Sequence, residues 1–222
     1  MSFNIIPKCA PDKKLLSLVA DAGFAGVELY TNRHIIAAGD RVIKLCRNFK
    51  LRYAVHGPND DCRVEDLVNF IRKFRPEVLI LHNLYWDDEW EYLYKKTKGL
   101  PTKVCLENTF SITEPVRFMR RYGFRMCTDL EHLQVEAAGL FGEVFLDILK
   151  QAGHVHITGY RYGKTEWHTP AYFNPGHTLK LFRLIKNSGY SGLLVSEAGV
   201  KYQTKEGFEQ LKRFSEKINN SL

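Results

Sequence analysis

The sequence alternates short apolar runs with amphipathic helical stretches, and it does so eight times. Strand-like runs are expected at 3–6, 26–30, 51–56, 77–82, 103–109, 124–132, within 154–168 and at 193–199. Helical spacing of apolar residues is found at 11–22, around Ile43 and Cys46, at 64–74, after the fourth run, at 116–123, 144–151, 175–187 and 205–218. Such an order predicts parallel strands joined by helices, and eight units are the number that closes a barrel.

We therefore expect the α/β class: one compact (β/α)8 TIM barrel of parallel strands that forms a single domain over residues 1–222. An open, doubly wound sheet is the alternative. Three long segments, 84–88, 134–143 and 160–174, follow strand ends. In a barrel these segments would surround the catalytic mouth.

Composition places the chain among ordinary globular proteins, with 45% hydrophobic and 26% charged residues. No apolar run is long enough to cross a bilayer, and the first residues lack the features of a signal peptide, so we expect a cytoplasmic protein without a membrane partner. The five cysteines have no paired spacing, which favours reduced thiols.

The formal net charge of +7 suits an anionic partner such as a phosphorylated metabolite or a nucleic acid. Solubility explains it equally well, because the Lys and Arg residues are scattered along the chain and form no single tract.

Metal-binding residue types gather in one stretch, where His154, His156, Glu166 and His168 fall within fifteen residues of a chain with only eight histidines. Imidazole and carboxylate groups bind zinc, manganese or cobalt, so the composition of the stretch leaves the metal open. Other apolar runs also end in residues that can bind a metal, so the stretch is interpreted together with them.

The spacing of these residues along the strands is consistent from one strand to the next. Residues two apart share a face, so if the strand-end residues point into the barrel, their neighbours two positions earlier lie one layer deeper. The expected upper layer is Glu107, Asp129, His156 and Glu197, and the expected lower layer is Cys105, Cys127, His154 and Val195. We expect His154 to be a packed or supporting residue and the cysteines to fill the core.

A carboxylate within an apolar run costs several kcal/mol to bury unless it is paired or bound to a metal. Glu107 and Glu197 both stand in such runs. A hydrogen-bonded structural role would explain any one strand-end histidine, such as His82, but the set with His56, His156 and Asp129 predicts a site.

The chain resembles the xylose isomerase-like barrels over nearly its whole length. The motifs that carry the resemblance are His56-Gly-Pro, Leu81-His82, Leu106-Glu107-Asn-Thr, Asp129-Leu-Glu-His132, His154-Val-His156, Glu166-Trp-His168 and Ser196-Glu197. This superfamily includes sugar isomerases and epimerases as well as the endonuclease IV group of DNA-repair enzymes. The Leu-Glu-Asn-Thr strand and the Asp-x-x-His turn are its most specific pieces.

Resemblance to the sugar epimerases implies one divalent ion held by Glu107, Asp129, His156 and Glu197. It also implies that Glu107 and Glu197 are catalytic and exchange a proton with the carbon beside a carbonyl, while His132 contacts the substrate. Arg161, a few residues past His156, is expected to bind a substrate oxygen or phosphate.

Resemblance to the endonuclease IV group implies three zinc ions and additional ligands. The additional positions are His56, His82, His132, Glu166 and His168. Glu166 departs from that group's pattern, which has aspartate there, and this puts the third ion in doubt. The first strand-to-helix segments are also short for gripping a DNA duplex.

We therefore expect a metal-dependent isomerase or epimerase that acts on a small sugar, phosphorylated or not, with one to three ions of zinc, manganese or cobalt. The alternatives are a multi-zinc phosphodiesterase for abasic DNA and a barrel that binds metal or ligand without turnover. The sequence leaves the oligomeric state open. Aromatic residues at 86, 90, 92 and 94 suit either an interface or inward packing.

Overall fold

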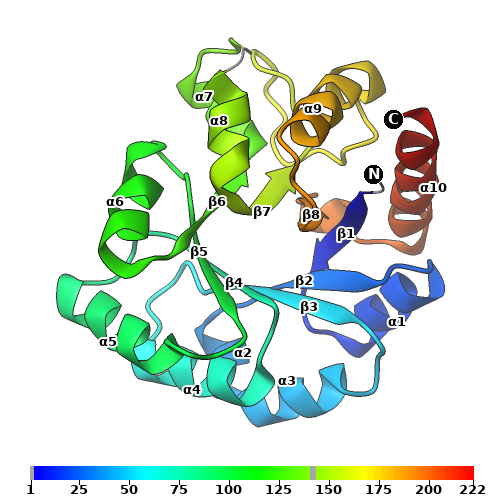
Figure 1. The fold of residues 1–222 in the computed structure, drawn as a ribbon. Helices are drawn as coiled ribbons and strands as arrows, with labels where there is room; N and C mark the ends of the chain where they lie inside the picture. Colours follow the sequence, from blue (N-terminus) through cyan, green and yellow to red (C-terminus); the bar gives the residue numbers. More distant parts are fainter. Residues whose placement is uncertain (1–2, 141–143) are drawn as a thin grey trace.

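The computed structural model describes residues 3–140 and 144–222, which form a closed barrel of eight parallel strands in chain order (Figure 1). The strands are β1 (Asn4–Cys9), β2 (Gly26–Tyr30), β3 (Arg52–His56), β4 (Val78–Leu81), β5 (Lys103–Glu107), β6 (Arg125–Asp129), β7 (Ala152–Ile157) and β8 (Leu193–Ser196). Pairing of β1 with β8 closes the barrel, from Asn4 beside Leu193 to Pro7 beside Ser196. This confirms the predicted (β/α)8 barrel and excludes the open sheet.

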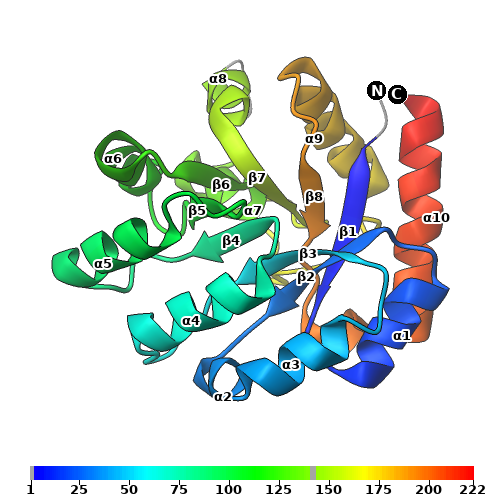
Figure 2. The same cartoon turned by 60° about the horizontal axis from the view of Figure 1, so that its bottom comes forward.

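The helices form a layer around the strands (Figures 1 and 2). They are α1 (Lys13–Asp21), α2 (Arg33–Ala37), α3 (Gly39–Cys46), α4 (Val64–Phe74), α5 (Asp87–Thr97), α6 (Thr113–Tyr122), α7 (Leu130–Glu136), α8 (Val144–Gln151), α9 (Pro175–Asn187) and α10 (Lys205–Ser221), with a short 3-10 helix at Val200–Tyr202. The bounds of α4, α8 and α9 agree with the sequence patterns. Helices α2 and α7 were not expected.

Local signals account for several helix ends. The Asp12 carboxylate caps α1 by accepting hydrogen bonds from the backbone N–H groups of Lys14 and Leu15 at 2.8 and 3.1 Å. Thr204 caps α10 in the same way, through the N–H of Gly207 at 3.1 Å. Helix α6 ends at Gly123, whose φ of +68° lies in the left-handed region that glycine adopts without strain.

Period-two alternation fills the barrel interior. Below the carboxyl ends of the strands, one apolar cluster is formed by Ile6, Ala54, Val78, Ile80, Cys105, Cys127, Leu193 and Val195. Cys105, Cys127 and Val195 thus lie in the lower layer, where the sequence register placed them. All five cysteines of the chain are buried and free of disulfides.

Two element boundaries differ from the sequence interpretation, and both affect the site. Strand β1 continues past Pro7 to Cys9, because Pro7 still pairs with Ser196 although it has no N–H to donate. Strand β6 stops at Asp129, and α7 begins at once at Leu130. His132 therefore lies in the first turn of a helix and not on a strand.

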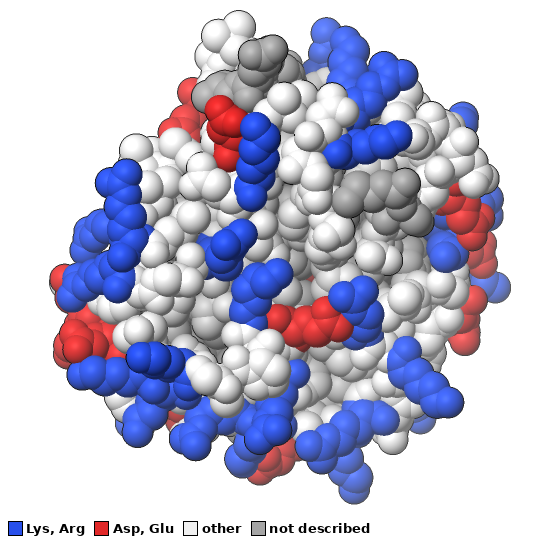
Figure 3. All heavy atoms as spheres, in the orientation of Figure 1, with Lys and Arg blue, Asp and Glu red and all other residues white. Residues whose placement is uncertain are grey.

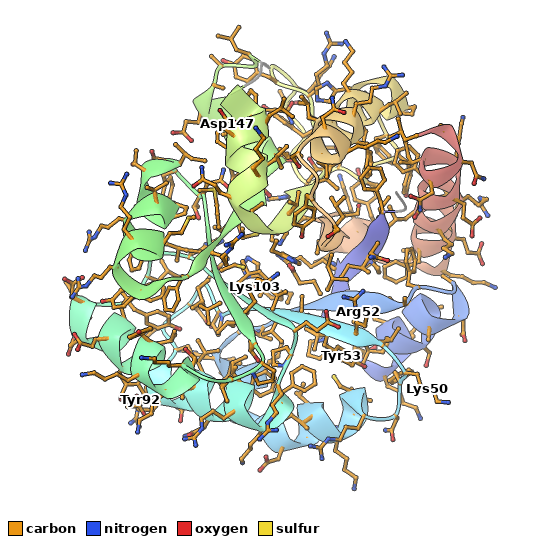
Figure 4. All side chains as sticks on the ribbon, in the orientation of Figure 1. Lys50, Arg52, Tyr53, Tyr92, Lys103 and Asp147 are labelled. Carbon is orange, nitrogen blue, oxygen red and sulfur yellow. The ribbon has the colours of Figure 1, made fainter. Side chains whose placement is uncertain are left out.

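The view in Figure 1 looks at the amino ends of the strands, and Figure 4 labels Arg52 and Lys103, the first residues of β3 and β5, near the middle of the ring. Basic side chains are spread over most of the perimeter of this face, with no single tract (Figure 3). This distribution fits the scattered charge of the sequence.

Two observations concern the expected loops and partners. Residues 141–143, the end of the expected loop 134–143, lie outside the described residues. Among the described helices, none is both long and apolar enough to cross a membrane.

Every large hydrophobic residue that is exposed in the described part lies at or after the carboxyl end of a strand, including Trp86 at 79% and Phe110 at 85% exposure.

The aromatic segment after β4 faces two ways. Trp90 on α5 is buried, and its ring centroid lies 4.6 Å from that of Phe118 and 5.3 Å from that of Tyr85. Trp86, just before the helix, is exposed. Inward packing therefore explains Trp90 but not Trp86.

We predict that Trp90→Ala lowers the free energy of unfolding by about 3–5 kcal/mol, because it leaves a large cavity between α5, α6 and the barrel. Urea denaturation followed by far-UV circular dichroism measures this change. Trp86→Ala is the matched control and should change stability by less than about 0.5 kcal/mol. Equal effects of the two substitutions would contradict this packing.

Candidate metal centre

A ring of polar side chains lies at the carboxyl ends of the strands, and every strand contributes one member. In chain order they are Lys8, Glu28, His56, His82, Glu107, Asp129, His156 and Glu197. Six of the eight are at least nine-tenths buried, and the side chains of His82 and Glu197 are 16% and 14% exposed. The ring sits directly above the apolar cluster of the barrel interior.

The four expected ligands of a single ion come together in this ring. One ligand atom from each of Glu107, Asp129, His156 and Glu197 lies within 4.8 Å of the others. The Nδ1 atom of His156 is 2.8 Å from Glu197 Oε2, 3.5 Å from Glu107 Oε2 and 3.7 Å from Asp129 Oδ2. The strand register brings these residues together, although they are far apart in the sequence.

Unsatisfied atoms at this point fit a divalent cation. Asp129 Oδ2, His156 Nδ1 and Glu197 Oε2 are buried and form no regular hydrogen bond among the described residues, although Nδ1 and Oε2 lie 2.8 Å apart. Buried polar atoms are normally satisfied, so a convergent group of such atoms indicates a cation site. One imidazole with three carboxylates is a donor set suited to zinc, manganese or cobalt.

A second group of ligand atoms shares Glu107 with the first. His56, His82 and Glu107 also offer atoms within 4.8 Å of one another. The Nε2 atoms of His56 and His82 lie 3.1 and 3.4 Å from Glu107 Oε2. His132, from α7, approaches the other oxygen of the same carboxylate, with its Nδ1 3.4 Å from Glu107 Oε1.

The structure places the remaining predicted residues outside both groups. Glu166 is half-exposed and pairs with Lys201 and the hydroxyl of Tyr202. Nδ1 of His168 lies 3.5 Å from Glu131, and its side chain is 42% exposed. Neither Glu166 nor His168 belongs to a cluster of possible metal ligands in the described part of the chain.

Arg161 is exposed and does not touch the ring. It lines a cleft of about 900 Å³ beside α9 together with His177 and Lys180, and no member of the ring is among the described lining residues. Arg161 therefore lines a cleft to which none of the ring residues is seen to contribute. Its role as a substrate ligand stays a prediction.

Sequence reasoning missed two ring members, Lys8 and Glu28. Glu28 is fully buried, and its Oε2 accepts hydrogen bonds from the Nε2 atoms of His154 and His156 at 2.8 and 3.0 Å. Lys8 Nζ lies 3.3 Å from Glu28 Oε1 and donates a hydrogen bond to Glu197. The signal for Glu28 was present, since it is a carboxylate within the apolar run Gly26-Val-Glu-Leu-Tyr30.

Another buried carboxylate, Glu131, supports the loop that follows β7. It accepts hydrogen bonds from the Thr158 hydroxyl at 2.5 Å and from the backbone N–H of His168 at 3.1 Å. His168 has a φ of +51°, an unusual value for a residue other than glycine. Because Glu131 and the N–H of Gly199 hold both sides of His168, they maintain this backbone conformation.

The ring contains carboxyl groups with opposite pKa shifts. Burial opposes the charge of Glu107, but the imidazoles of His156, His56 and His82 hold its pKa well below the usual range. For Glu197, Lys8 and His156 outweigh burial and lower the pKa in the same way. Burial raises the pKa of Asp129 to about 7, which His132 opposes and the Glu197 and Glu107 charges reinforce.

The sequence matches no known family model and no curated protein. Solved structures do match. D-allulose 3-epimerase from Methylomonas sp., in complex with D-allulose, aligns over 99% of this chain and 97% of its own, with a TM-score of 0.72 and 12% identity. The TTHB071 protein from Thermus thermophilus, soaked with ZnCl2, aligns over 97% of this chain and 99% of its own, with a TM-score of 0.68 and 12% identity.

An L-ribulose 3-epimerase structure aligns over 100% of this chain and 97% of its own, with a TM-score of 0.57 and 14% identity. These structures share the (β/α)8 fold of this chain. The barrel fold expected from the sequence is thereby confirmed. At these identities the activity has to be argued from the site itself.

We predict that the affinity of the ring for zinc falls as the pH drops through 7. Protons compete with the ion, because Asp129 must lose a proton to bind it, and the apparent affinity should fall about tenfold per pH unit for each proton displaced. Competition with a chromophoric chelator at pH 6, 7 and 8 measures this slope. Asp129→Asn should bind more weakly and with a flatter slope, and an affinity independent of pH would contradict the prediction.

Proposed function

We propose that the chain is a divalent-metal-dependent isomerase or epimerase acting on a small sugar. The observation that carries this proposal is the convergence of Glu107, Asp129, His156 and Glu197 at the carboxyl ends of the strands, where the active sites of TIM barrels lie. The fold, shared with sugar epimerases, supports it.

The residues of the ring would divide the chemistry among them. A divalent ion held by Glu107, Asp129, His156 and Glu197 would supply an electrophile that polarises the substrate carbonyl. Glu107 on β5 and Glu197 after β8 come from different sides of the barrel, and their low pKa values keep both ionised near neutral pH. One of them, as the carboxylate, would take the proton from the carbon beside the carbonyl. The other would first take a proton from solvent and then return it to the enediolate.

His132 would contact the substrate in this reaction. His132 lies in the first turn of α7, where its backbone N–H donates a hydrogen bond to Asp129 Oδ1 at 2.7 Å. Burial opposes its charge, but Asp129, Glu107 and Glu197 raise its pKa above the usual value. A protonated imidazole at this position would donate a hydrogen bond to a substrate oxygen on which negative charge develops.

We predict that Glu107→Gln lowers activity by about 10²–10⁴-fold or more, because the amide can neither take the proton nor bind the ion as a carboxylate does. Incubation with a panel of ketoses and their phosphates in D2O, with Mn²⁺, Co²⁺ or Zn²⁺, measures turnover as solvent deuterium incorporated beside the carbonyl. Glu91→Gln, on the outer surface of α5, is the control and should retain wild-type turnover. Deuterium exchange by Glu107→Gln at the wild-type rate would contradict the mechanism.

A second candidate, an endonuclease IV-type phosphodiesterase, is favoured by the second ligand group of His56, His82 and Glu107. Two ions sharing Glu107 could together bind the phosphodiester and activate water. Elemental analysis of the purified protein, with incision of an abasic-site duplex in the presence and absence of a chelator, separates the candidates. Two or three zinc ions with chelator-sensitive incision would replace the epimerase proposal, and one ion without incision would support it.

A further inference from the structure

Glu28, on β2, links the candidate metal centre, through His156 on β7, to Lys8 on β1. Its carboxylate is fully buried in the middle of β2, and Oε2 accepts from His154 Nε2 at 2.8 Å and from His156 Nε2 at 3.0 Å. The other oxygen, Oε1, lies 3.3 Å from Lys8 Nζ. Glu28 is absent from the four-residue ligand group, although ligand atoms of Glu28, His154 and His156 also lie within 4.8 Å of one another.

These contacts assign different tasks to the two nitrogens of His156. Nε2 donates to Glu28, so Nδ1 is the nitrogen that faces the other ligands, 2.8 Å from Glu197 Oε2 and 3.7 Å from Asp129 Oδ2. A carboxylate bound to the far nitrogen of a ligating histidine fixes the tautomer, holds the ring plane and makes the near nitrogen more basic.

Lys8 extends the same support to another ligand. Its ammonium group contacts both Glu28 and Glu197, and it is itself buried. Lys8 therefore balances the charge of Glu28 and holds Glu197, so that one buried ion cluster orients a ligand on β7 and a ligand after β8. Without such a counter-ion, a carboxylate at the position of Glu28 would be expensive to bury.

We propose that Glu28 is a positioning residue for the metal centre, which selects Nδ1 of His156 as the metal-binding nitrogen and, through Lys8, orients Glu197. This inference rests on the proposed metal-dependent function. A histidine on the same strand provides the internal comparison. His154 shares the same Glu28 oxygen but lies one layer deeper and is absent from the four-residue ligand group.

Zinc affinity of Glu28→Gln, measured by chelator competition, tests the proposal. The amide keeps the shape of the side chain but loses the charge that holds both His156 and Lys8, and affinity should fall about 10–100-fold. Glu131→Gln, at a buried carboxylate that bonds Thr158 and the backbone N–H of His168 but not His156, is the matched control and should retain wild-type affinity. Circular dichroism and thermal unfolding of each variant restrict the comparison to folded protein.

The nitrogen assignment is tested in the wild-type protein, so it does not depend on the folding of any variant. Long-range ¹H–¹⁵N NMR of the zinc-loaded protein should show His156 with a metal-bound Nδ1 and a protonated Nε2. Zinc bound through Nε2, or Glu28→Gln with wild-type affinity, would overturn the inference and leave the metal centre in place. A wild-type protein that binds no divalent ion would contradict the proposed function and the inference together.

Discussion

The burial of four carboxylates in one end of a barrel is the constraint on which the rest of this structure depends. The side chains of Glu28, Glu107 and Asp129 are buried and that of Glu197 is 14% exposed, and an uncompensated charge in such a place would cost several kcal/mol. Lys8 and the surrounding imidazoles supply part of the opposing charge. Each strand must keep its register, because a shift of one residue would exchange its polar ring member for an apolar one.

Period-two patterning made much of the site predictable. Once parallel strands are expected, residues at their carboxyl ends have to meet, and the lower layer of Cys105, Cys127 and Val195 follows from the same register. Hence Glu107, Asp129, His156 and Glu197 could be grouped without any spatial information. Helices with strong local signals, such as α4 and α9, could also be located closely.

Other parts of the site depend on tertiary structure. Lys8 follows Pro7, where the first strand was expected to have ended, yet barrel closure against β8 carries the strand past the proline. For Glu166 and His168, closeness to His156 in the sequence does not correspond to closeness in the structure. They follow His156 by about a dozen residues, but the loop after β7 directs them toward Lys201 and Glu131.

The two ligand groups meet at a single side chain, which makes the chemistry of the ring sensitive to small changes. Glu107 belongs to the four-residue group, whose other members come from β6, β7 and the end of β8. It also belongs to the group with His56 and His82, which lie at the ends of β3 and β4. A fold of this kind hosts several reactions, and under the proposed function the occupancy of these two neighbouring groups would distinguish proton transfer from phosphate-ester hydrolysis.

The contact between Lys8 and Glu197 joins the first strand to the segment after the last, across 189 positions of sequence. Because every strand contributes to the ring, no fragment of the barrel contains the complete site. The ring forms only when the whole chain has folded and closed, a step dominated by contacts of long sequence separation and therefore slow. A cation that binds the finished ring stabilises the closed barrel over every partly folded form, so metal supply and folding yield would be coupled.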